Sequence, residues 1–393
     1  MFSRLRQRYL LGQLAAAWEE GAVGSHCIGT IKNQIVHGTR AVNVPPSTTA
    51  RVHRLEAWRG SMTIVGTHEA DLDPTWVSAR PLERGVMKFE DWDAEARYFE
   101  YSKAADPLAE GTISRIPAAV FGPETYSDGP TRIIALDLSA ELGVKGGPAT
   151  SPALLASFLR ILAGEQLSTS PNATSQLYYV LYGSGFSAVN GSLVRWAKGD
   201  FLTLPAGSVS TFHADADAVL YWVTDEPLMR YLGVQATTPR FRPTKFACAD
   251  AVAELQRISS APGANEKSRV SVLLANAEQE QTLTITHVLW AMFGLLPIGQ
   301  VQRPHRHQSV ALDLILDCQP GCFTLLGDRL DERGEIVDPV CVPWQPGGAF
   351  ITPPGKWHAH HNESGAPAHL VPVQDAGLHT YLRSLDIRFT DRR

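Results

Sequence analysis

An internal repeat constrains the fold of this chain more than any other sequence feature. Two copies of one pattern of glycines, prolines and a tryptophan follow each other in the second and third parts of the chain. The matched segments are residues 163–166 with 298–301, 196–199 with 344–347, and 205–207 with 353–355. Such a repeat indicates that one small folding unit occurs twice. The sequence therefore predicts two similar domains rather than one large one.

Short apolar or alternating runs separated by glycine and proline occupy both copies. Examples are residues 177–181 and 312–316. Runs of this length, separated by turn signals such as residues 183–185 and Asn190-Gly191, are typical of strands joined by hairpins. We therefore predict an all-β fold of two antiparallel jelly-roll barrels, also called double-stranded β-helices.

The repeat also predicts where the domains begin and end. Residues 1–125 are expected to form a partly helical N-terminal extension, with a helix over residues 5–20. The first barrel is expected over residues 126–236 and the second over residues 265–393. Residues 237–264 should link them, with a helix over residues 251–258.

Composition excludes some classes of partner. A net charge of −5 argues against nucleic acid, and no apolar run approaches the length of a membrane span. The basic start of the chain runs into Glu19-Glu20 without a small-residue cleavage site, which favours an amphipathic helix over a targeting peptide. Five sparse cysteines favour reduced thiols and a cytoplasmic location.

Three histidines in the second copy form a candidate metal site. His305 and His307 are two residues apart, so that a strand would place both on one face. A Gly-Gly pair and a Pro-Pro-Gly turn precede His358 at the start of a further predicted strand. Three neutral imidazoles leave positions open for chemistry. The imidazoles alone suit Zn, Ni, Cu or Mn as well as iron.

The first copy has lost these ligands. By the alignment of the repeat, Ser170, Asn172 and Ser210 stand where the three histidines stand in the second copy. Hydroxyl and amide groups are poor metal ligands beside imidazole. We therefore expect the first barrel to be metal-free and to serve packing or oligomer formation.

The complete spacing resembles the two motifs of the cupin superfamily. A glycine stands six positions before the first histidine of His-x-His, and the second motif has the form G-x5-P-x-G-x2-H-x3-N. The residues concerned are Gly299, His305 and His307, then Gly347, Pro353, Gly355, His358 and Asn362. The usual glutamate ligand is missing, since Ala311 and Leu312 occupy its place. A site of three histidines, with Trp290 upstream, resembles the bicupins of the gentisate and salicylate 1,2-dioxygenase group.

This resemblance implies an enzyme and a chemistry. It implies a non-haem Fe(II) dioxygenase that uses O2 to cleave the ring of a hydroxylated or amino-substituted aromatic compound, as in aromatic degradation, and that forms a homo-oligomer. It places Trp290 in the wall of the substrate pocket. It also places His360 beside the substrate, where a pKa near the working pH would let it move protons. A structural role for His360 remains equally open.

Two residues near the predicted site suggest an altered substrate. Counting in twos from His305 and His307 brings Asp313 onto the inward face. The resemblance implies an arginine there that binds a substrate carboxylate, so the charge is reversed. Asp313 either contacts the substrate, favouring an amine or hydroxyl donor, or orients a ligand histidine. Arg303 is inward by the same count and is a candidate for the missing cation.

Other functions remain open at this stage. One is an Fe(II) cupin oxygenase that acts on a small molecule without ring cleavage. Another is a metal-dependent hydrolase or a bicupin that only binds a small molecule. The substrate, the metal and the number of subunits are not determined by the sequence.

Overall fold

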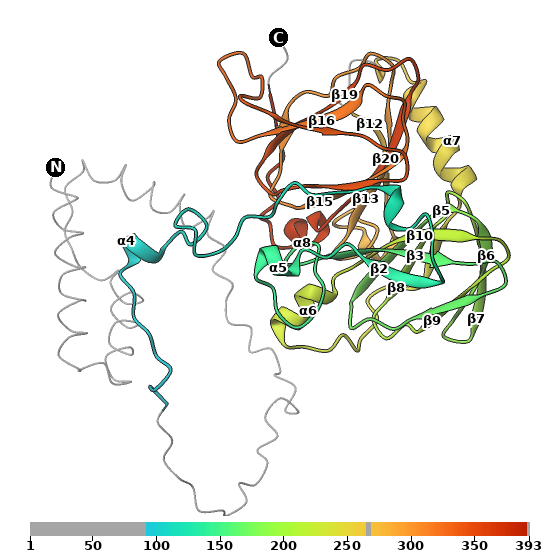
Figure 1. Ribbon diagram of the computed structural model, residues 1–393, viewed down its shortest axis with the longest axis horizontal. Helices are drawn as coiled ribbons and strands as arrows, with labels where there is room; N and C mark the ends of the chain where they lie inside the picture. Colours follow the sequence, from blue (N-terminus) through green and yellow to red (C-terminus); the bar gives the residue numbers. More distant parts are fainter. Residues whose placement is uncertain (1–91, 265–268, 391–393) are drawn as a thin grey trace, which may run out of the picture. The chain divides into compact units, whose positions relative to one another are not determined.

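The barrels lie in the second of two compact units of the chain. The computed structural model describes residues 92–264 and 269–390. Clustering of the chain's contacts separates the part that begins at Arg97, which holds both barrels (Figure 1). The helix predicted over residues 5–20 falls outside the described residues.

The first barrel consists of two antiparallel sheets, whose strands run from green to yellow in Figure 1. The larger sheet has the order β11-β8-β5-β10-β3-β2 and the smaller one β4-β9-β6-β7. Their bounds are β2 Arg132–Ala135, β3 Leu155–Ile161, β4 Gln166–Thr169, β5 Ser175–Tyr182, β6 Ser184–Val189, β7 Ser192–Ala197, β8 Phe201–Pro205, β9 Ser210–Ala214, β10 Ala218–Thr224 and β11 Thr244–Phe246.

The second barrel repeats this plan. Its larger sheet has the order β1-β18-β15-β20-β13-β12 and its smaller one β17-β16-β19-β14-β21. Their bounds are β1 Val120–Phe121, β12 Val270–Leu274, β13 Trp290–Leu296, β14 His305–Arg306, β15 Ala311–Asp317, β16 Cys322–Gly327, β17 Val340–Pro343, β18 Ala349–Thr352, β19 Trp357–Asn362, β20 Ala368–Gln374 and β21 Arg388–Phe389.

The described helices are short, and all but α4 lie between strands. They are α4 Tyr101–Ala104, η3 Pro123–Thr125, α5 Ser139–Leu142, α6 Glu226–Leu232, α7 Cys248–Ser259, η5 Ala277–Gln279 and α8 Ala376–Tyr381. Helix α7 covers the helix predicted over residues 251–258. None of the described helices is long and apolar enough to cross a membrane.

Two strands of the barrels come from segments that were not predicted to belong to a barrel. β1 comes from the predicted N-terminal extension and pairs with β18 of the second barrel. β11 comes from the predicted linker and pairs with β8 of the first barrel. The domain boundaries drawn from the sequence stay predictions. These pairings show that the end of the predicted extension and part of the predicted linker each add a strand to a barrel sheet.

Of the two turns predicted as hairpins, only one joins paired strands. Asn190 and Gly191 have φ values of 45° and 83°, as the tight turn between β6 and β7 requires. Gly183 instead lies between β5 of the larger sheet and β6 of the smaller one. A Cβ there would lie 2.5 Å from the Cβ of Ala218, so glycine permits this close corner.

The larger sheets of the two barrels share one hydrophobic core. Alternate residues of β5, including Leu177 and Tyr179, belong to the same buried cluster as Leu312 and Leu314 of β15. The residues between them face the interiors of their own barrels, as Ile315 does in the second. Asp313 has the same parity as Ile315, which places it inside the second barrel.

Candidate metal and substrate site

The three predicted metal ligands come together inside the second barrel. His305 on β14 is directly paired with His358 on β19, and their ring centroids lie 4.0 Å apart. The ring of His307 lies 4.9 Å from that of His358. The amide of Gly355, in the Pro-Pro-Gly turn, donates to the carbonyl of His307 at 2.7 Å, so this turn fixes both motifs together.

A main-chain carbonyl orients each of these rings. The Nδ1 atoms of His305, His307 and His358 lie 3.0, 2.9 and 3.1 Å from the carbonyl oxygens of Arg303, Ser309 and Lys356 respectively. A carbonyl can only accept, so Nδ1 carries the proton and the lone pair is on Nε2. This is the usual orientation of metal-binding histidines.

The electrostatics of the rings also suit a metal. Burial lowers the pKa of His307 to about 4 and lowers the pKa values of His305 and His358 well below the ordinary value. All three are therefore neutral near pH 7, as metal ligands must be. Nε2 of His307 is buried and has no hydrogen-bond partner among the described residues. A metal ion would satisfy this orphaned lone pair.

The cation beside the histidines is Arg269, which the sequence did not predict. Arg269 precedes β12, and its Nη2 lies 2.8 Å from Nε2 of His305. Its Nη1 also lies 3.6 Å from the sulfur of Met292. In this arrangement no three His, Cys, Asp or Glu side chains of the described chain surround one point as metal ligands. Binding by all three histidines therefore requires the guanidinium to leave Nε2 of His305.

His360 lies next to this group but differs from the expectation for it. Its ring centroid is 5.8 Å from that of His358. Burial, and then the charge of Arg269, lower its pKa well below the ordinary value, rather than leaving it near the working pH. Thr324 Oγ1 accepts from Trp344 Nε1 at 2.8 Å and lies 2.8 Å from Nδ1 of His360. The threonine hydroxyl can therefore donate to Nδ1, which leaves a proton on Nε2. His360 is placed as a neutral hydrogen-bond donor.

Asp313 lies inside the barrel, as the alternation predicts. Its side chain is 2% exposed, and Thr352 Oγ1 donates to it at 2.7 Å. Burial raises the pKa of Asp313 to about 6, although Thr352 and the charge of Arg269 oppose the rise. The carboxylate and the guanidinium thus act on each other across the interior, and neither charge is buried alone.

Trp290 has the orientation expected of a pocket wall. It shares a face of β13 with Leu296, whose side chain packs in the interior of the second barrel. Its indole nitrogen is buried and has no hydrogen-bond partner among the described residues. This N–H is available to a bound molecule.

The structure corrects the expectation for Arg303. Its Nη1 donates to the carbonyl of Thr390 at 3.0 Å, and its guanidinium lies over the ring of Phe389. That ring in turn stacks on His305, with 5.1 Å between centroids. Counting in twos fails here because β14 begins only at His305, after Pro304. Arg303 therefore anchors the C-terminal strand β21, and the cation inside the site is Arg269.

Hydroxyl groups fill the corresponding place in the first barrel. Thr169, not Ser170, is paired with Ser210 as His305 is with His358, so the sequence alignment was one residue out. Thr169 Oγ1 lies 2.7 Å from Ser210 Oγ and 2.9 Å from the hydroxyl of Tyr178. Asn172 instead donates to the carbonyl of Val234. Three mutually bonded hydroxyls thus stand where the second barrel has imidazoles.

Fold and site together define a protein of two cupin barrels with a histidine cluster in the second. The chain superimposes on salicylate 1,2-dioxygenase from Pseudoaminobacter salicylatoxidans bound to gentisate, with a TM-score of 0.55 and 14% identity over 90% of this chain and 96% of that one. Another structure of that enzyme gives the same TM-score over 89% of this chain and 99% of that chain. This likeness confirms the predicted fold class. No protein-family model matches the sequence.

Curated relatives narrow the resemblance to 1,2-dioxygenases named for aromatic compounds. The 5-aminosalicylate 1,2-dioxygenase of a Comamonas species is 33% identical over 116 residues, 25% of this chain and 31% of that protein. The 1-hydroxy-2-naphthoate 1,2-dioxygenase of Nocardioides sp. (strain KP7) is 27% identical over 158 residues, 40% of this chain and 38% of that protein. Gentisate 1,2-dioxygenase 1 of Aquipseudomonas alcaligenes is 32% identical over 104 residues, 26% of each. The resemblance stated from the motifs is confirmed, and the matches span roughly a quarter to two fifths of these relatives.

Proposed function

We propose that this chain is an Fe(II)-dependent dioxygenase that cleaves the ring of a hydroxylated or amino-substituted aromatic compound. The arrangement of His305, His307 and His358 carries the proposal. Each imidazole has its Nδ1 proton held by a carbonyl, and one Nε2 has no partner. Fe(II) held by the three Nε2 atoms would bind oxygen substituents of the aromatic ring and activate O2. The names of the three relatives support this chemistry.

The chain's own residues would position the aromatic substrate. Arg269 would leave Nε2 of His305 and pair with a carboxylate on the ring, since a guanidinium binds a carboxylate through two parallel hydrogen bonds. The buried N–H of Trp290 and the Nε2–H of His360 would donate to substrate oxygens. A ring seated against Trp290 would exclude water from the reacting carbons.

Asp313 would then select the remaining substituent. A carboxylate acceptor in a buried site favours an amino or hydroxyl donor and disfavours a second carboxylate. We therefore expect Asp313→Arg to improve the binding of an aromatic substrate with an added carboxylate and to weaken that of an amino-substituted one. Unchanged relative kcat/KM values for the two substrates would remove Asp313 from the pocket.

Oxygen uptake tests the proposed function directly. The iron-loaded protein is mixed with gentisate, salicylate or 5-aminosalicylate in an oxygen electrode, and loss of the aromatic absorbance reports ring opening. His307→Ala, which removes one ligand, is the inactive control. O2 uptake without loss of the ring would indicate another oxidation. No uptake from iron-loaded protein with any aromatic substrate would refute ring cleavage.

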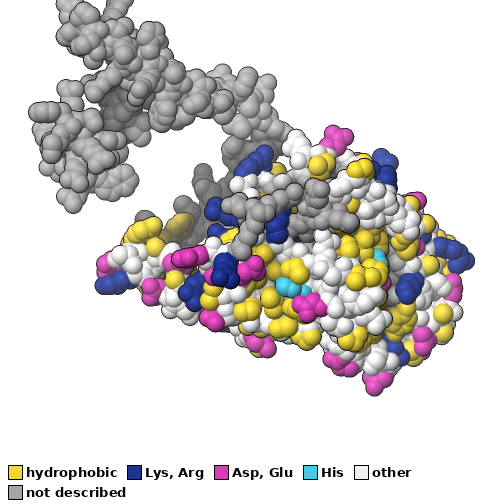
Figure 2. All heavy atoms as spheres, turned by 90° about the horizontal axis from the view of Figure 1, so that it is seen from above, with side chains coloured by type: hydrophobic (Ala, Val, Ile, Leu, Met, Phe, Trp, Pro, Cys, Tyr) yellow, Lys and Arg dark blue, Asp and Glu magenta, His cyan; other side chains and the backbone are white. Residues whose placement is uncertain are grey.

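We also propose that the protein is a cytoplasmic homo-oligomer without a nucleic-acid partner. The four cysteines of the described residues, Cys248, Cys318, Cys322 and Cys341, are all unpaired thiols, which suits a reducing compartment. On the face shown in Figure 2, side chains of both charges are interspersed rather than gathered by sign. This distribution differs from the basic patch that nucleic-acid binding requires.

A further inference from the structure

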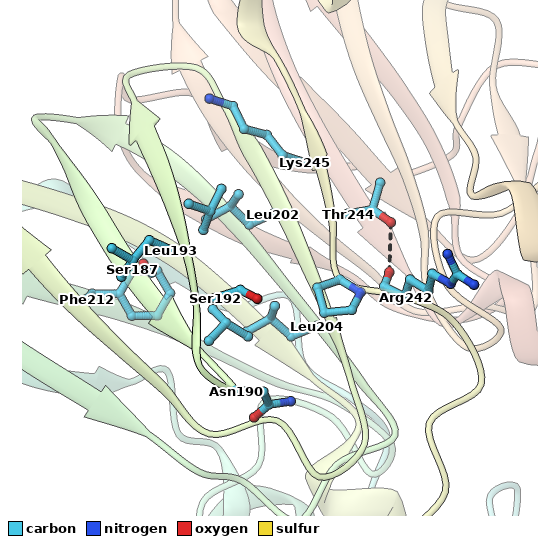
Figure 3. Close-up of a pocket in the computed structure, with 13 residues that line it drawn as sticks. Ser187, Asn190, Ser192, Leu193, Leu202, Leu204, Phe212, Arg242, Thr244 and Lys245 are labelled. Atoms are coloured by element: carbon cyan, nitrogen blue, oxygen red, sulfur yellow. Dashed lines mark hydrogen bonds between the residues drawn. The ribbon is translucent and has the colours of Figure 1, made fainter.

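The first barrel contains a cavity of its own. It has a volume of about 570 Å³ and lies between the smaller sheet, at β6, β7 and β9, and the larger sheet, at β8 and β11. Its inner wall consists of Val189, Leu202, Leu204 and Phe212, all buried members of this barrel's core. Figure 3 shows these leucines and Phe212 together, with Ser187 beside Phe212. A cavity of this size is ordinary for a small-molecule site.

Strand pairing relates this cavity to the site in the second barrel. Phe212 is paired with Ser187 as His360 is with Thr324. Phe212 therefore occupies the position of His360. The hollow of the first barrel lies against this interior position, with an apolar ring in place of the imidazole.

The same comparison extends to Leu204. The alignment of Pro205 with Pro353 places Leu204 at the position of Thr352, the residue that donates to Asp313. The polar wall of the second barrel is thus apolar at this point in the first. This replacement changes the class of molecule that the cavity suits.

Charge at the mouth further limits the ligand. Nζ of Lys245 lies 2.7 Å from the Asp200 carboxylate, so its charge is already balanced. The guanidinium of Arg242 points away from Leu204 and Ser192 in Figure 3. Neither cation is directed at the apolar wall. An anionic ligand would therefore be desolvated without a partner.

One hydroxyl in the lining is available for a weakly polar group. Ser187 Oγ accepts from Trp196 Nε1 at 2.9 Å, which leaves the serine proton free to donate and a second lone pair free to accept from a ligand N–H. We propose that the first barrel binds a neutral apolar small molecule, aromatic or alicyclic, with at most one hydroxyl or N–H group. The proposal does not depend on the function proposed for the second barrel.

Binding of indole to the metal-free, full-length protein tests this proposal by isothermal titration calorimetry. Val194 lines the cavity from β7, and Val194→Trp would place an indole ring inside it. We expect this variant to weaken indole binding by about tenfold or more, because the ring loses its space. Leu204→Thr, which introduces the hydroxyl that the second barrel has, should weaken it by about fivefold.

Val209→Trp is the matched control. Val209 is 54% exposed in the same barrel and does not line the cavity, so its indole affinity should equal that of the wild type. Thermal melting shows whether each variant is folded. Absence of indole binding by the wild type would overturn the proposal. Wild-type affinity for indole in both Val194→Trp and Leu204→Thr, each shown to be folded, would also overturn it. Binding that appears only when the protein is diluted to monomers would show that a second copy fills the cavity, and would also overturn it.

Discussion

Asp313→Asn should make the metal-free protein more stable at neutral pH than the wild type. The substitution keeps the shape of the side chain and an acceptor for Thr352 but removes a buried charge. The pKa of Asp313 is about 6 in the folded chain against an ordinary 3.8. Because one pKa unit corresponds to about 1.4 kcal/mol, the ionised form costs about 3 kcal/mol of stability.

The sign of this effect follows from proton linkage. A raised folded pKa means that the folded chain holds the proton while the unfolded chain has released it. The contribution of Asp313 to the free energy of unfolding is therefore fully present below about pH 4, and it is lost as the pH rises toward and through about 6. The wild type should lose roughly 1.5 kcal/mol relative to Asp313→Asn between about pH 5 and about pH 7.5.

Urea unfolding of both proteins at these two pH values measures the difference. The matched control is Asp338→Asn, which removes the same charge from a side chain that is 90% exposed and only distantly paired with Arg329. Its stability relative to the wild type should change little with pH. The difference in free energy of unfolding between Asp313→Asn and the wild type should widen as the pH rises. A difference that stays constant would refute the burial argument for Asp313.

Three further changes test separate parts of the site. Arg269→Leu should weaken the binding of a substrate carboxylate by roughly 30-fold or more and tighten metal binding, because the guanidinium that contacts His305 is gone. Arg303→Leu should leave the affinity for the carboxylate unaltered, and an equal loss of affinity in both variants would contradict the assignment of Arg269 as the cation of the site. Phe389→Ala should weaken Co(II) binding severalfold and shift the visible spectrum of the bound Co(II), because the ring that stacks on His305 is lost. Phe389→Tyr should keep the wild-type affinity and spectrum, and an unchanged spectrum in Phe389→Ala would exclude a positioning role for Phe389. Asn362→Ala should lower the free energy of unfolding by about 3 kcal/mol, because the buried carbonyl of Leu296 loses the amide donor and the buried N–H of Ser364 loses its acceptor. A loss below about 1 kcal/mol would contradict this.

The sequence was informative where spacing and alternation apply. Two histidines two residues apart and a third after a Pro-Pro-Gly turn were enough to predict the cluster. Alternation placed Asp313 inside the barrel because β15 is regular from Ala311 to Ile315. The same reasoning failed for Arg303, because the segment before Pro304 is not a strand and has no fixed alternation.

Residues that act from other strands could not be found in this way. Arg269 lies 36 residues before His305, and no local pattern distinguishes it from other arginines of the chain. The pKa of His360 depends on burial and on the neighbouring Arg269, and its tautomer on Thr324 and Trp344, which only the folded chain brings together. The recurrence of tryptophan at 196 and 344 was a usable signal, since each indole donates to a hydroxyl on the neighbouring strand.

Metal content per chain tests the central claim most directly. After iron loading under anaerobic conditions and removal of free metal, we expect one iron per chain in the wild type. The count should fall to near zero in His305→Ala, His307→Ala and His358→Ala, and stay at one in Ser210→Ala of the first barrel. Full retention of iron by the three histidine variants, or its loss only in Ser210→Ala, would contradict the assignment of the metal site to the second barrel.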